Sequence, residues 1–361
     1  MAHPESTGPL ARAEAFAERL GLRVPILLAP MAGACPPSLS IAVANAGGMG
    51  ACGALLMQPE AIRSWVEEFR SQSQGVFQIN LWIPGATPPR DPEAEQRVLD
   101  FLSSWGPAVP REAAESVLPD FEAQCVAMLN AQPTAISSIM GIYAPEFVSA
   151  MKSRGILWFA TATTVTEARA AADAGADAII AQGMEAGGHR GSFDPEEAER
   201  SLVGLFSLVP QIADAVRVPV IAAGGIADGR TVAAALTLGA SALMVGTGFL
   251  RCPEAKTHQA WADRIGGTEA HQTGLTRAFS GRAGRSVTTR YTQAAAADDA
   301  PPTAPYPIQR GFTRLMREEA ARANDAERLQ MWAGQSARLA QALPAGELTG
   351  RLWEEARSLL L

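Results

Sequence analysis

The sequence has few of the residues that build metal centres and disulfide frameworks. It contains four cysteines and four histidines in 361 residues. Cys35, Cys52, Cys125 and Cys252 lie far apart, with no CxxC pair and no Cys/His cluster at the spacing of metal ligands. This distribution argues against a structural zinc site and against a disulfide scaffold. We therefore expect a reduced, cytoplasmic protein without a bound metal.

Basic clusters, leader segments and common nucleotide motifs are missing as well. The formal net charge is −7 and the Lys and Arg residues are scattered, so nucleic acid is not an expected partner. The N-terminal stretch has no apolar signal core, which argues against export. No GxGxxG follows a strand-like run and no GxxxxGK[ST] occurs. The sequence therefore supports neither a Rossmann dinucleotide site nor a P-loop.

One segment, Thr231–Leu250, is 20 residues long without a charged side chain, which is enough to cross a bilayer. Glycines at 239 and 246 interrupt it. We prefer a buried helix over Thr231–Leu238 and a buried strand over Ala242–Val245, because parallel strands covered on both faces are continuously apolar. A membrane is therefore not an expected partner.

Short apolar or β-rich runs recur along the chain, and helical patterns rich in Ala, Leu and Glu separate most of them. Alternation of strand and helix eight times favours a closed parallel (β/α)8 barrel, the TIM barrel, over an open sheet. The eight runs are Pro25–Met31, Met49–Ala54, Val76–Trp82, Ala135–Ile139, Leu157–Ala162, Ala178–Gln182, Pro219–Ala223 and Ala242–Val245.

Two regions depart from this alternation. Residues 84–119, after the third run, are rich in Pro and charge, and we predict an insertion over the barrel mouth with a helix near 93–103. The barrel pattern stops past Pro253. We therefore assign residues 1–255 to the barrel and residues 256–361 to a C-terminal segment with a helical extension that packs on the barrel.

Two parts of that C-terminal segment differ in composition. Residues 294–307 are dominated by Ala, Asp and Pro, which predicts a low-complexity linker. Residues 309–361 have helical patterns, and we expect them to cap the barrel.

The stretch Ala181–Gly191, AQGMEAGGHRG, directly follows the sixth run. Its glycines let the backbone approach a ligand, while Gln182, Glu185 and His189 supply polar groups. His189 is the candidate for acid/base work, because imidazole titrates near neutral pH; the alternative is a plain hydrogen-bonding residue. Glu185 would orient His189 or accept a backbone N–H. The other histidines, for which we expect no chemistry, are His3, His258 and His271.

Two glycine turns follow the seventh and eighth runs: Gly224-Gly225 and Gly246-Thr247-Gly248. Neighbouring turns at these two strands of a barrel often bind phosphate, because backbone N–H groups and a helix N-terminus can surround an anion. The alternative is that these glycines only make tight turns.

Further candidates stand at other predicted strand ends. The amides of Asn80 and Gln182 suit the edge of a heterocycle such as a flavin, or tie down local turns. Ala29-Pro30-Met31 would lie along a flat ring, although Met31 also suits a core. Cys35 and Cys52 are expected to be buried small hydrophobes. Three aromatic residues either line the substrate pocket or serve in packing or at the surface: Trp82, Tyr143 and Tyr291.

With these motifs the chain resembles the nitronate monooxygenases, formerly called 2-nitropropane dioxygenases, which are flavin mononucleotide (FMN) enzymes on a TIM barrel. The matching segments span nearly the whole chain. They are LLAPMAG (27–33), VANAGGMGACGA (43–54), FQINLWIP (77–84), AQGMEAGGHRG (181–191), VIAAGGIADGR (220–230), VGTGFL (245–250), TRAFSGR (276–282) and WAGQSA (332–337).

The resemblance implies that His189 is the base that deprotonates nitroalkanes and that FMN is the cofactor. Family members often have Gln where this chain has Met244, which puts one side-chain contact in doubt but not the backbone of Gly246 and Thr247. The implied cofactor contacts are Ala29, Pro30, Met31, Asn80, Gln182, Gly187, Gly188, Gly224, Gly225, Met244, Val245, Gly246 and Thr247.

The activity implied by the resemblance is oxidative denitrification of an alkyl nitronate, such as propionate 3-nitronate, with O2 to a carbonyl compound and nitrite. A reductase of quinones or enoyl thioesters that uses NAD(P)H on the same barrel stays open. So do a flavin-free lyase or isomerase and a non-catalytic flavin-binding protein. The partners implied are a small-molecule nitronate and O2, and the sequence leaves the oligomeric state open.

Overall fold

The computed structural model describes residues 8–115 and 117–361. Eight parallel strands form one sheet in the order β1-β9-β8-β6-β5-β4-β3-β2. The sheet closes where Leu28 N donates to Met49 O at 2.9 Å and Met49 N donates to Ile26 O at 3.0 Å. The predicted (β/α)8 barrel is confirmed. Its strands are β1 (Ile26–Leu28), β2 (Gly50–Gly53), β3 (Phe77–Trp82), β4 (Ala135–Ile139), β5 (Leu157–Ala162), β6 (Ala178–Gln182), β8 (Val220–Ala223) and β9 (Ala242–Val245).

The strands are buried and mostly apolar on both faces because each face meets a different part of the core. Leu27, Ile180 and Ile221 belong to the cluster inside the barrel, whereas Ile26 and Ile179 belong to the layer between strands and helices. Helix α1 (Pro9–Arg19) packs into the inner cluster through Phe16 and Ala17. This double burial explains why continuous apolar runs located the strands.

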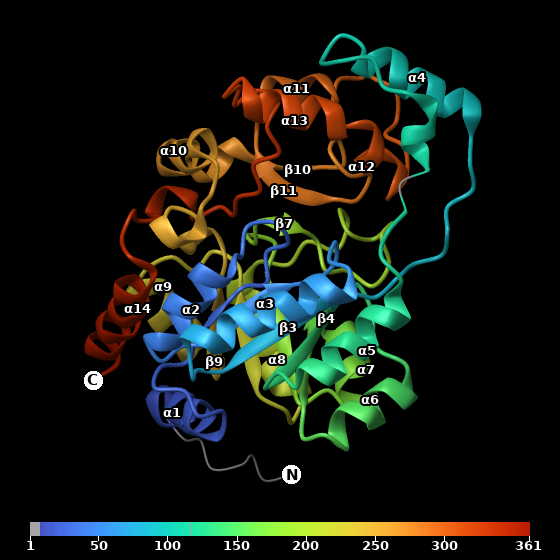
Figure 1. Cartoon of the computed structure of the whole chain (residues 1–361). Coiled ribbons are helices and arrows are strands. Elements are labelled where there is room, and N and C mark those ends of the chain that lie inside the picture. The colour runs from blue at the N-terminus through green and yellow to red at the C-terminus, as the bar shows by residue number, and fades with distance from the viewer. Residues whose placement is uncertain (1–7, 116) are drawn as a thin grey trace.

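A ring of helices surrounds the barrel, one after each strand (Figure 1). The last helix of the ring, α14, comes from the end of the chain and packs against α9 and α2. It follows β9 only after a long excursion. The ring consists of α2 (Pro37–Asn45), α3 (Pro59–Gln72), α5 (Phe121–Ala131), α6 (Pro145–Lys152), α7 (Val165–Asp173), α8 (Leu205–Ala215), α9 (Gly229–Thr237) and α14 (Ala345–Leu360).

The charge-free segment at 231–250 folds into most of α9, then β9 and a short turn of 3-10 helix, η2 (Thr247–Phe249). Of the helices in the described part of the chain, none combines the length and hydropathy that crossing a bilayer requires.

A second layer lies beyond one end of the barrel strands, where the insertion and the C-terminal segment meet (Figure 1). The helix predicted near 93–103 is α4, and its Val98 and Leu102 share an apolar cluster with Phe279, Phe312 and Met316. The insertion thus braces the C-terminal segment. The elements here are α4 (Pro92–Leu102), η1 (Arg111–Ala114), α10 (Gln259–Gly267), β10 (Thr273–Thr276), β11 (Gly284–Val287), α11 (Arg290–Ala294), α12 (Ile308–Phe312) and α13 (Arg314–Arg322).

Candidate active site

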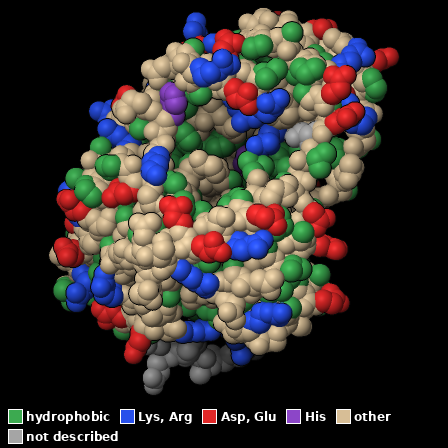
Figure 2. All heavy atoms as spheres, viewed as in Figure 1, with side chains coloured by type: hydrophobic (Ala, Val, Ile, Leu, Met, Phe, Trp, Pro, Cys, Tyr) green, Lys and Arg blue, Asp and Glu red, His purple; other side chains and the backbone are tan. Residues whose placement is uncertain are grey.

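A cavity of about 460 Å³ opens between the carboxyl ends of the strands and the C-terminal layer. Figure 2 shows it as a hollow in the face of the molecule, with basic side chains on its wall. Asn80 and Trp82 of β3, Gln182 of β6 and Met244 of β9 reach it from the barrel. Its size is that of a small-molecule site, and it lies at the end of the barrel where TIM-barrel enzymes do their chemistry.

The cavity brings together nearly all of the residues proposed from the sequence. Val245 is the exception: its side chain is buried in the layer between strands and helices, and its carbonyl accepts a hydrogen bond from Ala29 N at 2.9 Å. The predicted residues that line the cavity are Ala29, Pro30, Met31, Asn80, Gln182, Gly187, Gly188, His189, Gly224, Gly225, Met244, Gly246 and Thr247.

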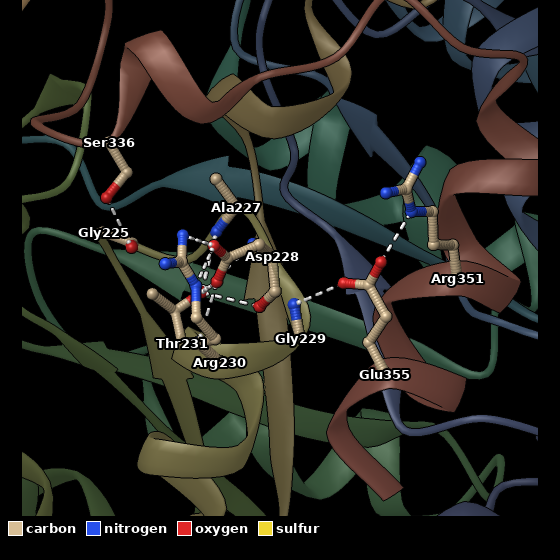
Figure 3. A network of polar contacts seen from close by, with 9 residues as sticks. All are labelled: Gly225, Ala227, Asp228, Gly229, Arg230, Thr231, Ser336, Arg351 and Glu355. Carbon is tan, nitrogen blue, oxygen red and sulfur yellow. Dashed lines mark hydrogen bonds and ion pairs between the residues drawn. The ribbon is translucent and has the colours of Figure 1, made fainter. Parts of the chain in front are cut away.

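The first glycine turn needs glycine for its backbone. Gly224 has φ 116° and Gly225 has φ 67°. Residues with a Cβ rarely adopt such positive φ values. Beyond the turn, the Asp228 side chain accepts from Thr231 N at 3.0 Å and caps α9. Figure 3 shows this network, in which Ser336 Oγ also donates to Gly225 O at 2.6 Å.

The second glycine turn is held by the same C-terminal stretch. Thr247 Oγ1 accepts a hydrogen bond from Gly334 N at 3.0 Å. Gly246 lies close to the first strand end, because a Cβ placed on it would be 3.3 Å from Ala29 Cβ and 3.5 Å from Met31 Sδ. The two turns and the residues after β1 therefore form one continuous wall with little side-chain bulk.

The two predicted amides line the cavity and also stabilise the scaffold. Asn80 Nδ2 donates to Ser137 O at 3.2 Å. Gln182 Nε2 donates to His189 O at 3.1 Å, and Gln182 Oε1 accepts from Gly191 N at 2.8 Å. Each amide keeps hydrogen-bonding capacity beyond these bonds. Gln182 thus fixes the backbone at His189 and two residues beyond it.

The backbone of His189 is ordered by strand pairing and not by a free turn. Gly188–His189 forms β7, which pairs antiparallel with β11 in a three-stranded sheet. The Glu185 carboxylate accepts a hydrogen bond from Leu205 N at 2.9 Å. Of the two roles predicted for Glu185, orienting His189 or accepting a backbone N–H, the structure therefore shows the second. Buried Arg190 donates from Nη1 to Gly183 O at 2.8 Å. The loop that presents His189 is therefore rigidly tied at both ends.

The His189 ring is enclosed by aromatic side chains and one hydroxyl. Its Nε2 lies 2.8 Å from Ser280 Oγ. The ring centroids of Trp82 and Trp332 each lie 4.7 Å from that of the imidazole. His258 lies elsewhere, with Nε2 3.0 Å from Ala321 O, and His3 lies outside the described residues.

The electrostatics of the site keep this imidazole neutral. Burial, together with the positive charges of Arg282 and Arg310, lowers the pKa of His189 to about 3. Desolvation disfavours the imidazolium, and nearby cations repel it. At neutral pH the ring therefore has one N–H and one lone pair, which suits a hydrogen-bonding or weakly basic group.

Several residues of the cavity wall were missed from the sequence. Tyr306 and Arg310 lie in or just after the segment predicted to be a linker, yet both line the cavity, as do Arg317 and Trp332. The surroundings of Tyr306 in sequence are low in complexity, and neither Tyr306 nor Arg310 belongs to a motif. For Trp332 and Ser280 a signal was available, because the WAGQSA and TRAFSGR segments contain them.

Of the three aromatic candidates, Trp82 lines the cavity. Tyr143 Oη donates to Ser137 O at 3.2 Å and Tyr291 Oη donates to Ala278 O at 2.9 Å, and both are buried in the core. Cys35 and Cys52 are buried free thiols, and burial raises the pKa of Cys35 to about 11. Both cysteines are therefore neutral core residues.

Comparison with known proteins places these features in a family context. A family model described as nitronate monooxygenase matches residues 14–355. A nitronate monooxygenase of Pseudomonas aeruginosa is 38% identical over 350 residues, covering 95% of this chain and 99% of that protein. A nitroalkane oxidase structure from Streptomyces ansochromogenes has a TM-score of 0.85 at 34% identity, covering 96% and 100% of the two chains. FabK of Thermotoga maritima has a TM-score of 0.74 at 27% identity, covering 96% of each chain.

Proposed function

Because the chain belongs to the nitronate monooxygenase family, we propose that it oxidises alkyl nitronates with O2, using FMN, to a carbonyl compound and nitrite. The observation that carries this proposal is the convergence of His189 and both glycine turns on one cavity. The turns supply an anion site, and the histidine supplies a neutral imidazole beside the space for the substrate.

The cavity wall fits FMN in size and chemistry. Gly224, Gly225 and Gly246 line the cavity with backbone alone, and an added Cβ on each would meet a protein atom at 3.0 to 3.3 Å. Glycine turns of this kind accept a phosphate. Asn80 and Gln182 would hydrogen-bond the ring edge with their remaining capacity. When bound, FMN would supply the one-electron oxidation of the nitronate and the chemistry with O2.

The protein's own residues would bind and orient the substrate. A nitronate is already an anion, so no proton has to be removed from its carbon. With a neutral nitroalkane, His189 would have to take that proton. Ser280 Oγ lies at Nε2, and Nδ1 has no hydrogen-bond partner within 8–115 and 117–361, so Nδ1 is the nitrogen that would receive it.

The low pKa of His189 favours the nitronate as substrate. A base with a pKa of about 3 is far below the value near the operating pH at which general-base catalysis is efficient. We therefore propose that preformed nitronates react much faster than neutral nitroalkanes.

Purified protein tests the proposal directly. A flavin absorbance spectrum, O2 uptake and nitrite release with ethyl nitronate are the expected results. Anaerobic mixing with NADH separates the alternative: rapid bleaching of the flavin without turnover of nitronate would identify an NAD(P)H-dependent reductase. A colourless protein that binds no added FMN would refute the flavin assignment.

A further inference from the structure

Residues 332–336, which we call the strap, cross three neighbouring loops at the mouth of the barrel. Strands β9, β8 and β6 are consecutive in the sheet, and one hydrogen bond joins the strap to the loop that follows each of them. Gly334 N donates to Thr247 Oγ1 at 3.0 Å, Ser336 Oγ donates to Gly225 O at 2.6 Å (Figure 3), and Gln335 N donates to Glu185 O at 2.9 Å. The strap therefore holds three separate loops as one unit.

The strap and the loop after β6 approach so closely that neither has room for a side chain. A Cβ placed on Gly187 would lie 2.5 Å from Gly334 N, and one placed on Gly334 would lie 2.7 Å from Glu185 O. Neither glycine has a positive φ, so the backbone conformation does not require glycine at these positions. The close approach of the two backbones does.

The strap is also part of the cavity wall. Trp332, Gly334 and Ser336 line the cavity, and the ring centroid of Trp332 lies 4.7 Å from that of His189. The loops that the strap joins are the two glycine turns, which offer an anion site, and the loop that leads to the histidine. The strap thus connects the two parts of the site on which the proposed function depends.

The firmer attachment of the strap is to the C-terminal layer. Trp332 forms an antiparallel β-bridge with Ser286 of β11, and Ala333 N donates to Arg285 O at 3.3 Å. Each barrel loop, in contrast, is joined to the strap by a single hydrogen bond. Single hydrogen bonds add little net stability, so these three can part locally while the barrel stays folded.

We propose that the strap couples cofactor binding to the C-terminal layer: FMN binds tightly when the three hydrogen bonds are closed, and bound FMN keeps them closed. The coupling is reciprocal, because a closed strap that raises the affinity for FMN is itself stabilised by FMN by the same factor. Gly334 and Ser336 are then positioning residues for the cofactor site. This inference rests on the FMN of the proposed function and not on the substrate that is oxidised.

Amide hydrogen exchange reports on the strap directly, because backbone N–H groups donate two of its three bonds. In the full chain, saturating FMN should slow the exchange of the Gly334 and Gln335 amides by about tenfold or more relative to the apoprotein. Amides of α6, which has none of the described cavity-lining residues, should exchange equally in both forms. Equal exchange of the strap amides with and without FMN would show that the strap only stabilises the fold, and would overturn the coupling.

Gly334→Ala should open the strap without removing a polar group, because its methyl would meet Glu185 O. The affinity for FMN, measured by the quenching of flavin fluorescence, should fall about 10- to 100-fold, which corresponds to the loss of one or two hydrogen bonds. Most of this loss should be faster dissociation. Gly350→Ala is the matched control, since an added Cβ there has no atom within 4 Å, and it should bind FMN as the wild type does.

Ser336→Ala and Ser336→Thr keep the test open if Gly334→Ala does not fold. Ser336→Ala should weaken FMN binding by roughly five- to tenfold, the effect of one hydrogen bond, and should speed exchange of the Gly334 and Gln335 amides at saturating FMN. Ser336→Thr keeps the hydroxyl and should restore both.

Two results with these variants would contradict the coupling. One is wild-type FMN affinity in Ser336→Ala, and the other is weaker binding without faster exchange, which would assign Ser336 to direct contact with the cofactor. A wild-type protein that binds no FMN would overturn both the coupling and the flavin assignment. If FMN protects the strap as expected but the protein oxidises no nitronate, the proposed oxidation fails while the coupling stands.

Discussion

Ser280 Oγ lies 2.8 Å from Nε2 of His189, although 91 positions separate the two residues. The same hydroxyl donates to Arg282 O at 3.2 Å and accepts from Arg282 N at 3.3 Å. A hydroxyl has one proton and two acceptor sites. When the hydroxyl proton of Ser280 points to Arg282 O and Arg282 N donates to one acceptor site, the second acceptor site takes Nε2–H of His189. In this arrangement the hydrogen bond from Nε2–H to Ser280 selects the tautomer that leaves the Nδ1 lone pair free.

Replacing Ser280 with Ala should lower kcat with a neutral nitroalkane about tenfold, because the loss of one hydrogen bond worth about 1.4 kcal/mol frees the imidazole to take the other tautomer. KM should change little. Ser280→Thr keeps the hydroxyl and should restore most of the rate. Steady-state kinetics at matched flavin content checks this. If Ser280→Thr were as slow as Ser280→Ala, packing and not the hydrogen bond would be responsible.

Replacing His189 with Asn should separate the two substrate forms. Turnover of a neutral nitroalkane should fall by up to about 10²-fold, the low end of the usual contribution of a general base, because the lowered pKa weakens His189 as a base. Turnover of the preformed nitronate should fall far less, because its carbon has no proton to lose. Nitrite release with nitroethane and with ethyl nitronate measures both. A large and equal loss on both substrates would exclude His189 as the carbon base.

The ligand-free protein should lose stability in acid through His189. Its folded-state pKa of about 3 lies below the ordinary value of 6.5, so between these values the unfolded chain binds more protons. The free energy of unfolding therefore falls as pH decreases through this window. Urea unfolding at pH 7 and pH 5 should show a larger loss for wild type than for His189→Asn. An identical loss for both proteins would contradict the lowered pKa.

Gly224→Ala should destabilise the fold by roughly 1 to 3 kcal/mol, because its φ of 116° disfavours any Cβ and the new methyl would lie 3.0 Å from Ala186 N. FMN binding should weaken as well. Gly350→Ala is the matched control: Gly350 lies inside α14 with no atom within 4 Å of the added Cβ, so stability should rise by about 0.5 to 1 kcal/mol. Denaturant unfolding and flavin titration of both variants decide the point.

The barrel was predictable because its strands are buried on both faces. The runs at Ala135–Ile139, Leu157–Ala162, Ala178–Gln182 and Ala242–Val245 match β4, β5, β6 and β9 residue for residue. The second layer was less predictable. Its packing depends on contacts between α4 and helices some 200 positions later. Neither α4 nor those helices has a local sequence pattern from which the contact can be predicted.

The candidate site divides in the same way. Asn80, Gln182 and the glycine turns stand directly at strand ends, so strand prediction placed them together. Tyr306 and Arg310 reach the cavity only because the C-terminal segment folds back over the barrel. A stretch rich in Ala, Asp and Pro offers no periodicity from which such a return can be predicted.

Helix α14 has a consequence for how the protein is made. The apolar surfaces of α9 and α2 have no cover until residues 345–360 arrive, and Leu348, Leu352 and Trp353 supply that cover. During synthesis the nascent barrel therefore keeps these apolar surfaces exposed while about a hundred further residues are translated. At ordinary translation rates this takes several seconds. A stop codon just before this helix would release a chain destined for chaperones and proteases.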